Sequence, residues 1–501
     1  MSNQSMAART DVRQETDRRW LILSVLVVAQ FMVVLDVAIV NVALPTIKND
    51  LHFSEDGLQW VITAYAILFG GVLLLGGRMA DLLGRRRVFM AGLGVFTIFS
   101  LLDGLAWSSG SLIVFRGLQG LGAALLAPAA LSILTTTFKE GRDRNVALGI
   151  WGAASGSGGA AGVLLGGALT SALSWSWIFF INVPVGLALL ALSPVLLKES
   201  RADLDHHHFD AAGAASITGG LMLLVYALTH ASQHGWATTE TVGLLAASAA
   251  LVIAFLVIEM RSPAPLLPLR IFRLRTLTAS NINALLMGAA IFSQFFLLTL
   301  YMQQVLHYSA LKTGVAYVAL TTAIVGFSAV SQALVTRVGI RLVLPVGMAL
   351  SAAGLVLYAQ LPVHGHYFSN LFPAFILSGI GLAFAFVPMS IGALTGVRPD
   401  DAGVASGLLN TNQQIGGAIG VAIATTIATT YTSHYVQGHP GVGPLDGAAL
   451  THGFQIAFYV LAALAALAAV VSAVMIEPGA AATTSSEATA GELTPALEEA
   501  A

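Results

Sequence analysis

The sequence has few charged residues and no cysteine. Only 10% of its 501 residues are Asp, Glu, Lys or Arg, whereas 56% are hydrophobic. A soluble domain carries about 25% charged residues, so this composition excludes a water-exposed surface over most of the chain and indicates that lipid covers it. The absence of cysteine excludes disulfides, thiol chemistry and cysteine metal sites.

Long apolar runs take the place of the missing charges. A helix rises ~1.5 Å per residue and must cross ~30 Å of hydrocarbon, so ~20 apolar residues form one span. Runs of this length predict an all-α integral membrane protein rather than a barrel. The first run is too long for a cleavable signal peptide, and we interpret it as a membrane helix. The fourteen expected spans are 20–44, 56–76, 88–107, 111–136, 146–170, 177–197, 211–230, 241–260, 276–303, 313–336, 341–361, 367–394, 404–431 and 454–476.

Basic residues favour one side of these spans. If the N-terminus is cytoplasmic, 20 of the 23 Lys and Arg residues fall in cytoplasmic segments. Lys48 and Lys312 then lie in outer loops, and Arg116 lies within a span. This asymmetry predicts that both termini are cytoplasmic. It also supports the number of helices, because one missed helix would reverse the alternation.

Two parts of the chain repeat each other weakly. The loop Gly77–Arg86 resembles Thr336–Arg341, and the stretch Gly120–Pro128 resembles Gly379–Pro388. Paired six-helix halves place a substrate site at the membrane midplane between them. The expected division is an N-terminal cytoplasmic segment 1–19, a first half 20–197, central loops with two inserted helices 198–275, a second half 276–476 and a disordered cytoplasmic tail 477–501.

Asp36 and Arg116 are the charged residues expected well inside spans. Carboxylates in lipid are costly and mark proton pathways, so we expect Asp36 to carry protons rather than only to brace its helix. Both residues lie at similar depth by helix rise, ~12 Å and ~8 Å below the outer surface. They either pair, or Arg116 extends to the outer headgroups. Asp103, Glu259 and Asp210 are expected near helix ends.

Glycine marks two further regions. In the loop after the second span, glycines permit a tight turn, and Asp81 and Arg85 are spaced to pair across one helical turn. The expected gating residues there are Gly77, Asp81, Gly84, Arg85 and Arg86. In the fifth span, four glycines leave one face bare, so that another helix either packs closely or slides past. These residues are Gly158, Gly162, Gly166 and Gly167.

Neutral polar residues within spans are expected to line a substrate cavity. Asn410 and Gln414 share a helix face at a spacing of four, and a hydrogen-bonded cluster between helices is the alternative. The expected cavity residues are Asn41, Gln119, Asn410 and Gln414. No catalytic constellation falls within a span, which argues against an enzyme. We interpret His206, His207 and His208 as a solvated loop, and we expect no metal site.

Four stretches together resemble the major facilitator superfamily, in its 14-helix drug:proton antiporter branch. They are the helix-1 signature Leu35–Pro45, the loop Gly77–Arg86, the helix-4 motif Arg116–Gly120 and the glycine-rich motif Gly149–Gly167. The sequence departs from the usual motifs at Ala38, Leu82 and Val163. The last replaces a proline that is associated with export in that family.

The resemblance implies two six-helix halves plus two inserted helices, and alternating access driven by the proton motive force without a cofactor. It implies a monomeric antiporter of the bacterial inner membrane, with protons, a small lipophilic substrate and lipid as its partners and no nucleic acid. Asp36 and Arg116 would couple protons to export. A proton-coupled uptake carrier for a nutrient is the alternative, motivated by Val163. Because 276–476 lacks a second deep carboxylate, we expect neutral or monocationic substrates.

Overall fold

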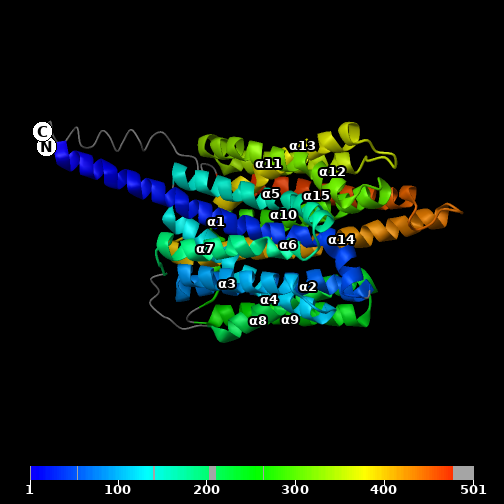
Figure 1. Cartoon of the computed structure of the whole chain (residues 1–501), viewed down its shortest axis with the longest axis horizontal. Coiled ribbons are helices and arrows are strands. Elements are labelled where there is room, and N and C mark those ends of the chain that lie inside the picture. Colours follow the sequence, from blue (N-terminus) through cyan, green and yellow to red (C-terminus); the bar gives the residue numbers. More distant parts are fainter. Residues whose placement is uncertain (1, 54, 139–140, 202–209, 263–264, 478–501) are drawn as a thin grey trace.

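The computed structural model describes the chain except residues 1, 54, 139–140, 202–209, 263–264 and 478–501. The histidine run and nearly all of the expected tail therefore lie outside the described residues. Within them the chain is helical, without strands (Figure 1). The α-helices are α1 (Ser2–Asp50), α2 (Glu55–Leu83), α3 (Arg85–Gly104), α4 (Ser109–Thr137), α5 (Arg142–Ala172), α6 (Trp177–Phe180), α7 (Asn182–Leu196), α8 (Ala211–His234), α9 (Thr239–Arg261), α10 (Arg275–Leu300), α11 (Ala310–Val338), α12 (Ile340–Tyr358), α13 (Phe372–Gly392), α14 (Ala402–Gly438) and α15 (Gly447–Met475).

Short helical segments extend this framework. The 3-10 segments are η1 (Leu269–Arg273) and η4 (Pro399–Asp401), and the π segments are η2 (Tyr301–Val305) and η3 (Tyr367–Leu371). The segment η2 directly continues α10, and the two form the span Arg275–Val305. The segment η3 directly precedes α13, and these two form the span Tyr367–Gly392. In the same way α6 and α7 together form the span Trp177–Leu196.

The predicted spans are confirmed. Thirteen helices among the described residues are long and apolar enough to cross a membrane, and counting the bent α5 gives fourteen. The two parts of α5 meet at an angle of 41°. Each expected run falls on one of these spans, because sustained hydropathy over ~20 residues leaves the backbone no alternative to a helix in lipid.

The helices form two halves, with a hairpin between them in sequence. In the first half, α4 packs against α2 and α3, and α1 packs against α5; in the second, α10 packs against α14, and α12 against α13 and α15. The halves meet along α5 with α11 and α2 with α14. The inserted hairpin α8–α9 lies at the side of the first half in Figure 1, where α8 contacts both α2 and α14. Trp236, at its turn, donates a hydrogen bond to the Thr426 hydroxyl at 2.8 Å.

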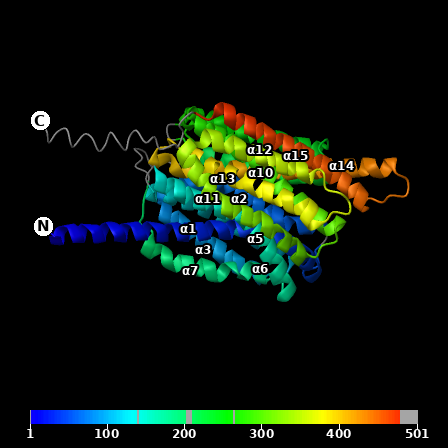
Figure 2. The ribbon, with the colours of Figure 1, turned by 90° about the horizontal axis from the view of Figure 1, so that it is seen from above.

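The two ends of the bundle carry different helix ends. We call the terminal face the end at which α1 enters the bundle, α2 ends, α3 begins and α15 ends. The opposite face carries the end of α1, the α3–α4 turn and the long α14–α15 hairpin. Figures 1 and 2 show that the start of α1 lies at one end of the bundle, with the α14–α15 hairpin projecting from the other.

Candidate functional site

A buried ion pair joins α1 to α4. The Asp36 side chain is 0% exposed and the Arg116 side chain 2%, and Arg116 Nη1 lies 2.7 Å from Asp36 Oδ2. The two residues predicted at similar depth are thus brought together, and Arg116 does not extend to the headgroups. Removing one partner of a buried ion pair typically costs about 3–5 kcal/mol, because the other charge stays buried and uncompensated.

Three neutral side chains complete a polar cluster around this pair. Gln119 Nε2 and Asn182 Nδ2 each donate to Asp36 Oδ1 at 2.9 Å. The hydroxyl of Ser100 accepts from Gln119 at 2.5 Å and from Asn182 at 3.2 Å. Arg116 also donates to the Gln119 side-chain oxygen. The Asp36 cluster, defined as Asp36, Ser100, Arg116, Gln119 and Asn182, therefore ties α1, α3, α4 and α7 together.

Aromatic rings and the backbone of α2 enclose the guanidinium. Its central carbon lies 4.4 Å from the centre of the Tyr65 ring and 5.5 Å from that of Phe179. Arg116 Nε donates to the carbonyl of Val61 at 3.3 Å. Because the ring faces attract cations, this environment holds the guanidinium in place beside Asp36.

Gln119, which was expected to line the substrate cavity, belongs to the Asp36 cluster instead. Its position three residues after Arg116 turns both side chains toward α1. Ser100 and Asn182 were missed as site residues. Both are fully enclosed polar residues in otherwise apolar spans, with 0% and 2% exposure. A search for such isolated polar residues would have found them.

The other expected cavity residues do not form one group. Asn41 is exposed near the end of α1, and its amide donates to the Val37 carbonyl at 3.1 Å. Asn410 is buried in α14 and donates to the Ser406 carbonyl at 2.9 Å. Gln414, one turn further, is half-buried opposite Gly70 of α2. Asn410 and Gln414 thus share a helix, and Gln414 lies at the seam between the halves.

The bare glycine face of α5 packs on α1 next to Asp36. A Cβ added at Gly158 would lie 2.8 Å from Val34 Cβ, and one at Gly162 would lie 2.7 Å from the carbonyl oxygen of Leu35. A Cβ at Gly166 would lie 2.8 Å from the carbonyl oxygen of Ile39. Gly167 is buried beside them. The two helices approach so closely that only glycine fits, and α5 thereby holds the segment of α1 that carries Asp36.

A latch closes the terminal face between the halves. Asp81 at the end of α2 pairs with Arg85 at 2.9 Å. It also accepts the backbone N–H groups of Gly403 and Val404, each at 3.2 Å, across the seam. These N–H groups belong to the first turn of α14, which has no partner for them within its own helix and carries a partial positive charge. Asp81 therefore caps a helix of the other half.

The remaining gating residues surround this latch. Gly84 joins α2 to α3 with a φ of +111°, which favours glycine. Arg86 donates to the Leu197 carbonyl at 3.2 Å, and its backbone N–H donates to Glu199 at the same distance. Two more links cross the terminal face, from Arg144 to the Leu394 carbonyl at 3.0 Å and from Arg270 to Asp401 at 3.2 Å. The structure is therefore closed at the terminal face.

A fully helical bundle of two halves, with a buried ion pair in the first and a latch between them, matches a known family. The family model for the Major Facilitator Superfamily matches residues 26–421. The chain belongs to the major facilitator superfamily. This places it among transporters rather than enzymes, and it shows that the protein is a multi-pass membrane protein.

Curated relatives of this major facilitator include two proteins from actinomycetes. It is 39% identical over 466 residues to the puromycin resistance protein pur8 of Streptomyces alboniger, covering 92% of each chain. It is 40% identical over 416 residues to the cephamycin export protein CmcT of Amycolatopsis lactamdurans, covering 82% of this chain and 85% of the relative. The human organic anion transporter MFSD10 (TETRAN) has the same fold, with a TM-score of 0.63, 15% identity and 91% and 99% coverage.

Proposed function

We propose that this major facilitator exports lipophilic antibiotics across the bacterial inner membrane in exchange for protons. The observation that carries the proposal is the buried Asp36–Arg116 pair, because a carboxylate within a membrane span is a default candidate for a proton carrier. Relatives whose names refer to puromycin resistance and cephamycin export support the substrate class.

The geometry suggests how one proton changes the protein. While Asp36 is ionised, it accepts hydrogen bonds from Arg116, Gln119 and Asn182. A proton on Asp36 cancels its charge and occupies one of its oxygen atoms, which weakens the links to α4 and α7. Since α5 packs on the same segment of α1, a shift of α1 is transmitted to a helix that contacts the second half.

The terminal face is the cytoplasmic side in this proposal, because 20 of the 23 basic residues fall on that side of the spans. The described structure then has its cytoplasmic gate closed by Asp81 and the start of α14. Release of a proton to the cytoplasm requires this latch to open. Re-closure of the latch turns the substrate site toward the outside.

The direction of transport is tested in everted membrane vesicles, whose cytoplasmic face is outside. Energised vesicles that contain the protein should accumulate labelled puromycin, and vesicles without the protein should not. Uptake is the alternative, since Val163 stands where the family usually has a proline. Accumulation in right-side-out vesicles, with none in everted ones, would establish the uptake carrier instead.

We expect the transporter to discriminate between substrates by their charge. Within the described residues of α10–α15 the carboxylates are confined to helix ends, as with Asp446, so a second charge on a substrate would find no partner in that half. We expect ethidium, a monocation, to be exported at least about tenfold faster than propidium, its dicationic analogue, because an uncompensated charge in the membrane costs well over 1.4 kcal/mol. Dye fluorescence in everted vesicles measures both rates, and equal rates would contradict the prediction.

A further inference from the structure

Asp103, in the last turn of α3, is a buried carboxyl whose two oxygen atoms have no hydrogen-bond partner among the described residues. Its side chain is 0% exposed. The sequence places Asp103 near a helix end, which the structure confirms, and the structure adds that this end of α3 is enclosed. The Phe180 ring lies against the adjacent Gly104, whose Cβ would be 2.6 Å from a ring carbon, and helps to cover this end of α3.

Asp103 lies next to the Asp36 cluster. Ser100, one turn earlier on α3, bonds to both Gln119 and Asn182, the two amides that hold Asp36. Residues three apart share a helix face, so Asp103 continues the polar line from Asp36 toward the opposite face. The groups that face it electrostatically are Arg116 of α4 and Asp36 of α1. Tyr65 of α2 also faces Asp103 electrostatically, and the Tyr65 hydroxyl has no hydrogen-bond partner among the described residues.

The environment of Asp103 fits a neutral carboxyl that can exchange its proton. An isolated ionised carboxylate without donors is costly in an apolar interior. Orphaned buried polar atoms commonly mark a catalytic group or an unseen water molecule. One guanidinium compensates one carboxylate, so Arg116 can balance either Asp36 or Asp103 in its ionised form, but not both together.

We propose that Asp103 is a second proton-carrying residue, which receives a proton from water at the opposite face and passes it to Asp36. The O–H bond of Asp103 breaks and an O–H bond forms on Asp36, directly or through one water molecule. The negative charge moves from Asp36 to Asp103, and Arg116 stays balanced throughout. This step deepens the proposed antiport and rests on it, because it assumes that Asp36 is the residue that takes up protons.

The test compares Asp103→Asn with wild type and with Asp50→Asn, a control at an exposed carboxyl that ends α1 at the same face. In vesicles, Asp103→Asn should slow proton movement driven by puromycin at least about tenfold, while puromycin binding stays as in wild type. Asp103→Glu should restore most of the rate. If wild type moves protons and Asp103→Asn matches it at every lumenal pH of everted vesicles, the role of Asp103 is refuted. If wild type itself moves none, the proposed antiport fails instead.

A spectroscopic readout separates proton carriage from packing. In substrate-free protein, infrared difference spectra should contain the C=O band of a protonated carboxylic acid that disappears in Asp103→Asn. The band should persist in the Asp50→Asn control, because Asp36 still balances Arg116 there and Asp103 stays protonated. A loss of transport without any such band in wild type would show that Asp103 only positions its neighbours.

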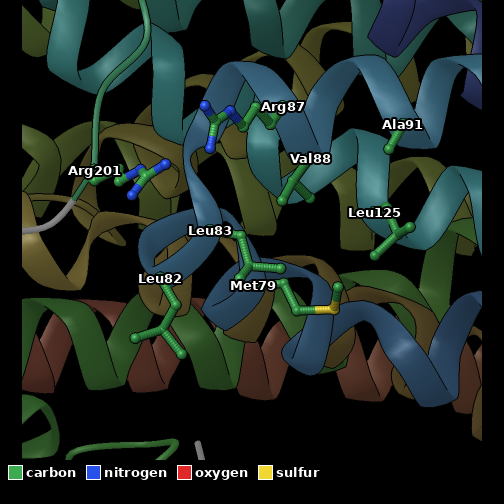
Figure 3. A pocket seen from close by; sticks show the side chains of 8 residues that line it. All are labelled: Met79, Leu82, Leu83, Arg87, Val88, Ala91, Leu125 and Arg201. Carbon is green, nitrogen blue, oxygen red and sulfur yellow. The ribbon is translucent and has the colours of Figure 1, made fainter. Parts of the chain in front are cut away.

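A cavity at the terminal face carries a second, independent inference. It has a volume of about 350 Å³ and lies between the end of α2 and the start of α3, with Leu125 of α4 at its side (Figure 3). Its remaining apolar lining is Met79, Leu82, Leu83, Val88 and Ala91. Figure 3 shows Arg87 and Arg201 together at one edge, away from most of this apolar lining. Both arginines and Leu83 are exposed. Glu199 is shared between Arg86 and Arg87, at 3.7 Å from each, so the three arginines leave this edge with a net positive charge.

We infer that this cavity binds an anionic phospholipid. The apolar lining suits acyl chains rather than a free phosphate, and two arginines at one edge suit the phosphate of a headgroup at the level where α2 ends. The site adjoins the latch, because Leu83 follows Asp81 by two residues. Lipid bound there would contact the α2–α3 turn on the side away from α14.

Native mass spectrometry of the purified protein with equimolar phosphatidylglycerol and phosphatidylcholine tests this inference. Wild type should retain phosphatidylglycerol preferentially, and the double variant Arg87→Gln, Arg201→Gln should lose at least about tenfold of that preference. The charge-matched control is the double variant Arg273→Gln, Arg341→Gln, at two exposed arginines of the same face, and it should behave as wild type. An equal loss in the control, or competition by millimolar inorganic phosphate, would refute a lipid site.

Discussion

Replacing Asp36 with Asn should reduce energised puromycin export by about two orders of magnitude, the typical effect of removing a positioned proton-transfer group. The amide has nearly the same shape and can still accept hydrogen bonds from Gln119 and Asn182. It cannot change its charge with pH, so the link between the proton gradient and the cluster is lost. Export is measured as accumulation of labelled puromycin in energised everted vesicles.

A double variant separates lost coupling from lost stability. Asp36→Asn alone removes the carboxylate that pairs with the buried Arg116, and breaking a buried ion pair typically costs about 3–5 kcal/mol. Combining it with Arg116→Met removes both charges, so the thermal unfolding temperature should recover toward that of wild type while export stays absent. Recovery of export in the double variant would show that Asp36 is structural, and wild-type export in Asp36→Asn would contradict the proton role outright.

Replacing Gly77 with Ala should hold the terminal face open. A Cβ at Gly77 would collide with the carbonyl oxygen of Gly403 and lie 3.3 Å from the Cα of Gly407. These atoms are backbone atoms of α14, so the two helices must separate. Overpacking typically costs about 1–3 kcal/mol, which shifts the population away from the closed state by about fivefold to more than a hundredfold. The rate of export should fall in proportion to the population of the closed state.

The conformational shift can be measured directly, because the chain has no cysteine. Spin labels on cysteines introduced at Leu83 and Val338, both exposed at the terminal face, report the distance between the halves. Gly77→Ala should populate longer distances than the parent. Gly94→Ala is the matched control, since its Cβ would meet nothing within 4 Å. A distance distribution unchanged by Gly77→Ala would contradict the latch.

Helix rise and hydropathy predicted the spans and the depth of charged residues. Those depths allowed Asp36 and Arg116 to meet but left open an extension of Arg116 to the headgroups, and only the structure shows that the two residues pair. The direction in which a side chain points around its helix did not follow. For that reason Gln119 was assigned to the cavity, and Ser100 and Asn182 were missed, although all three surround Asp36.

Contacts between distant parts of the chain were also beyond the sequence. Asp81 was recognised as an unusual carboxylate among arginines, but its partners on α14 lie 322 and 323 residues away. Asp103 was placed near a helix end correctly, yet its burial depends on the packing of neighbouring helices. Hydropathy describes how a helix meets lipid, and it contains no information on which neighbour covers a given turn.

Proton movement in energised everted vesicles tests the central claim most directly. A pH-sensitive dye inside the vesicles reports the lumenal pH when puromycin is added, for wild type and for Asp36→Asn. Exchange of drug for protons predicts that protons leave the lumen of wild-type vesicles on addition of drug, and that Asp36→Asn vesicles show no such change. An equal response from both proteins, or none from wild type while it accumulates puromycin, would contradict proton exchange through Asp36.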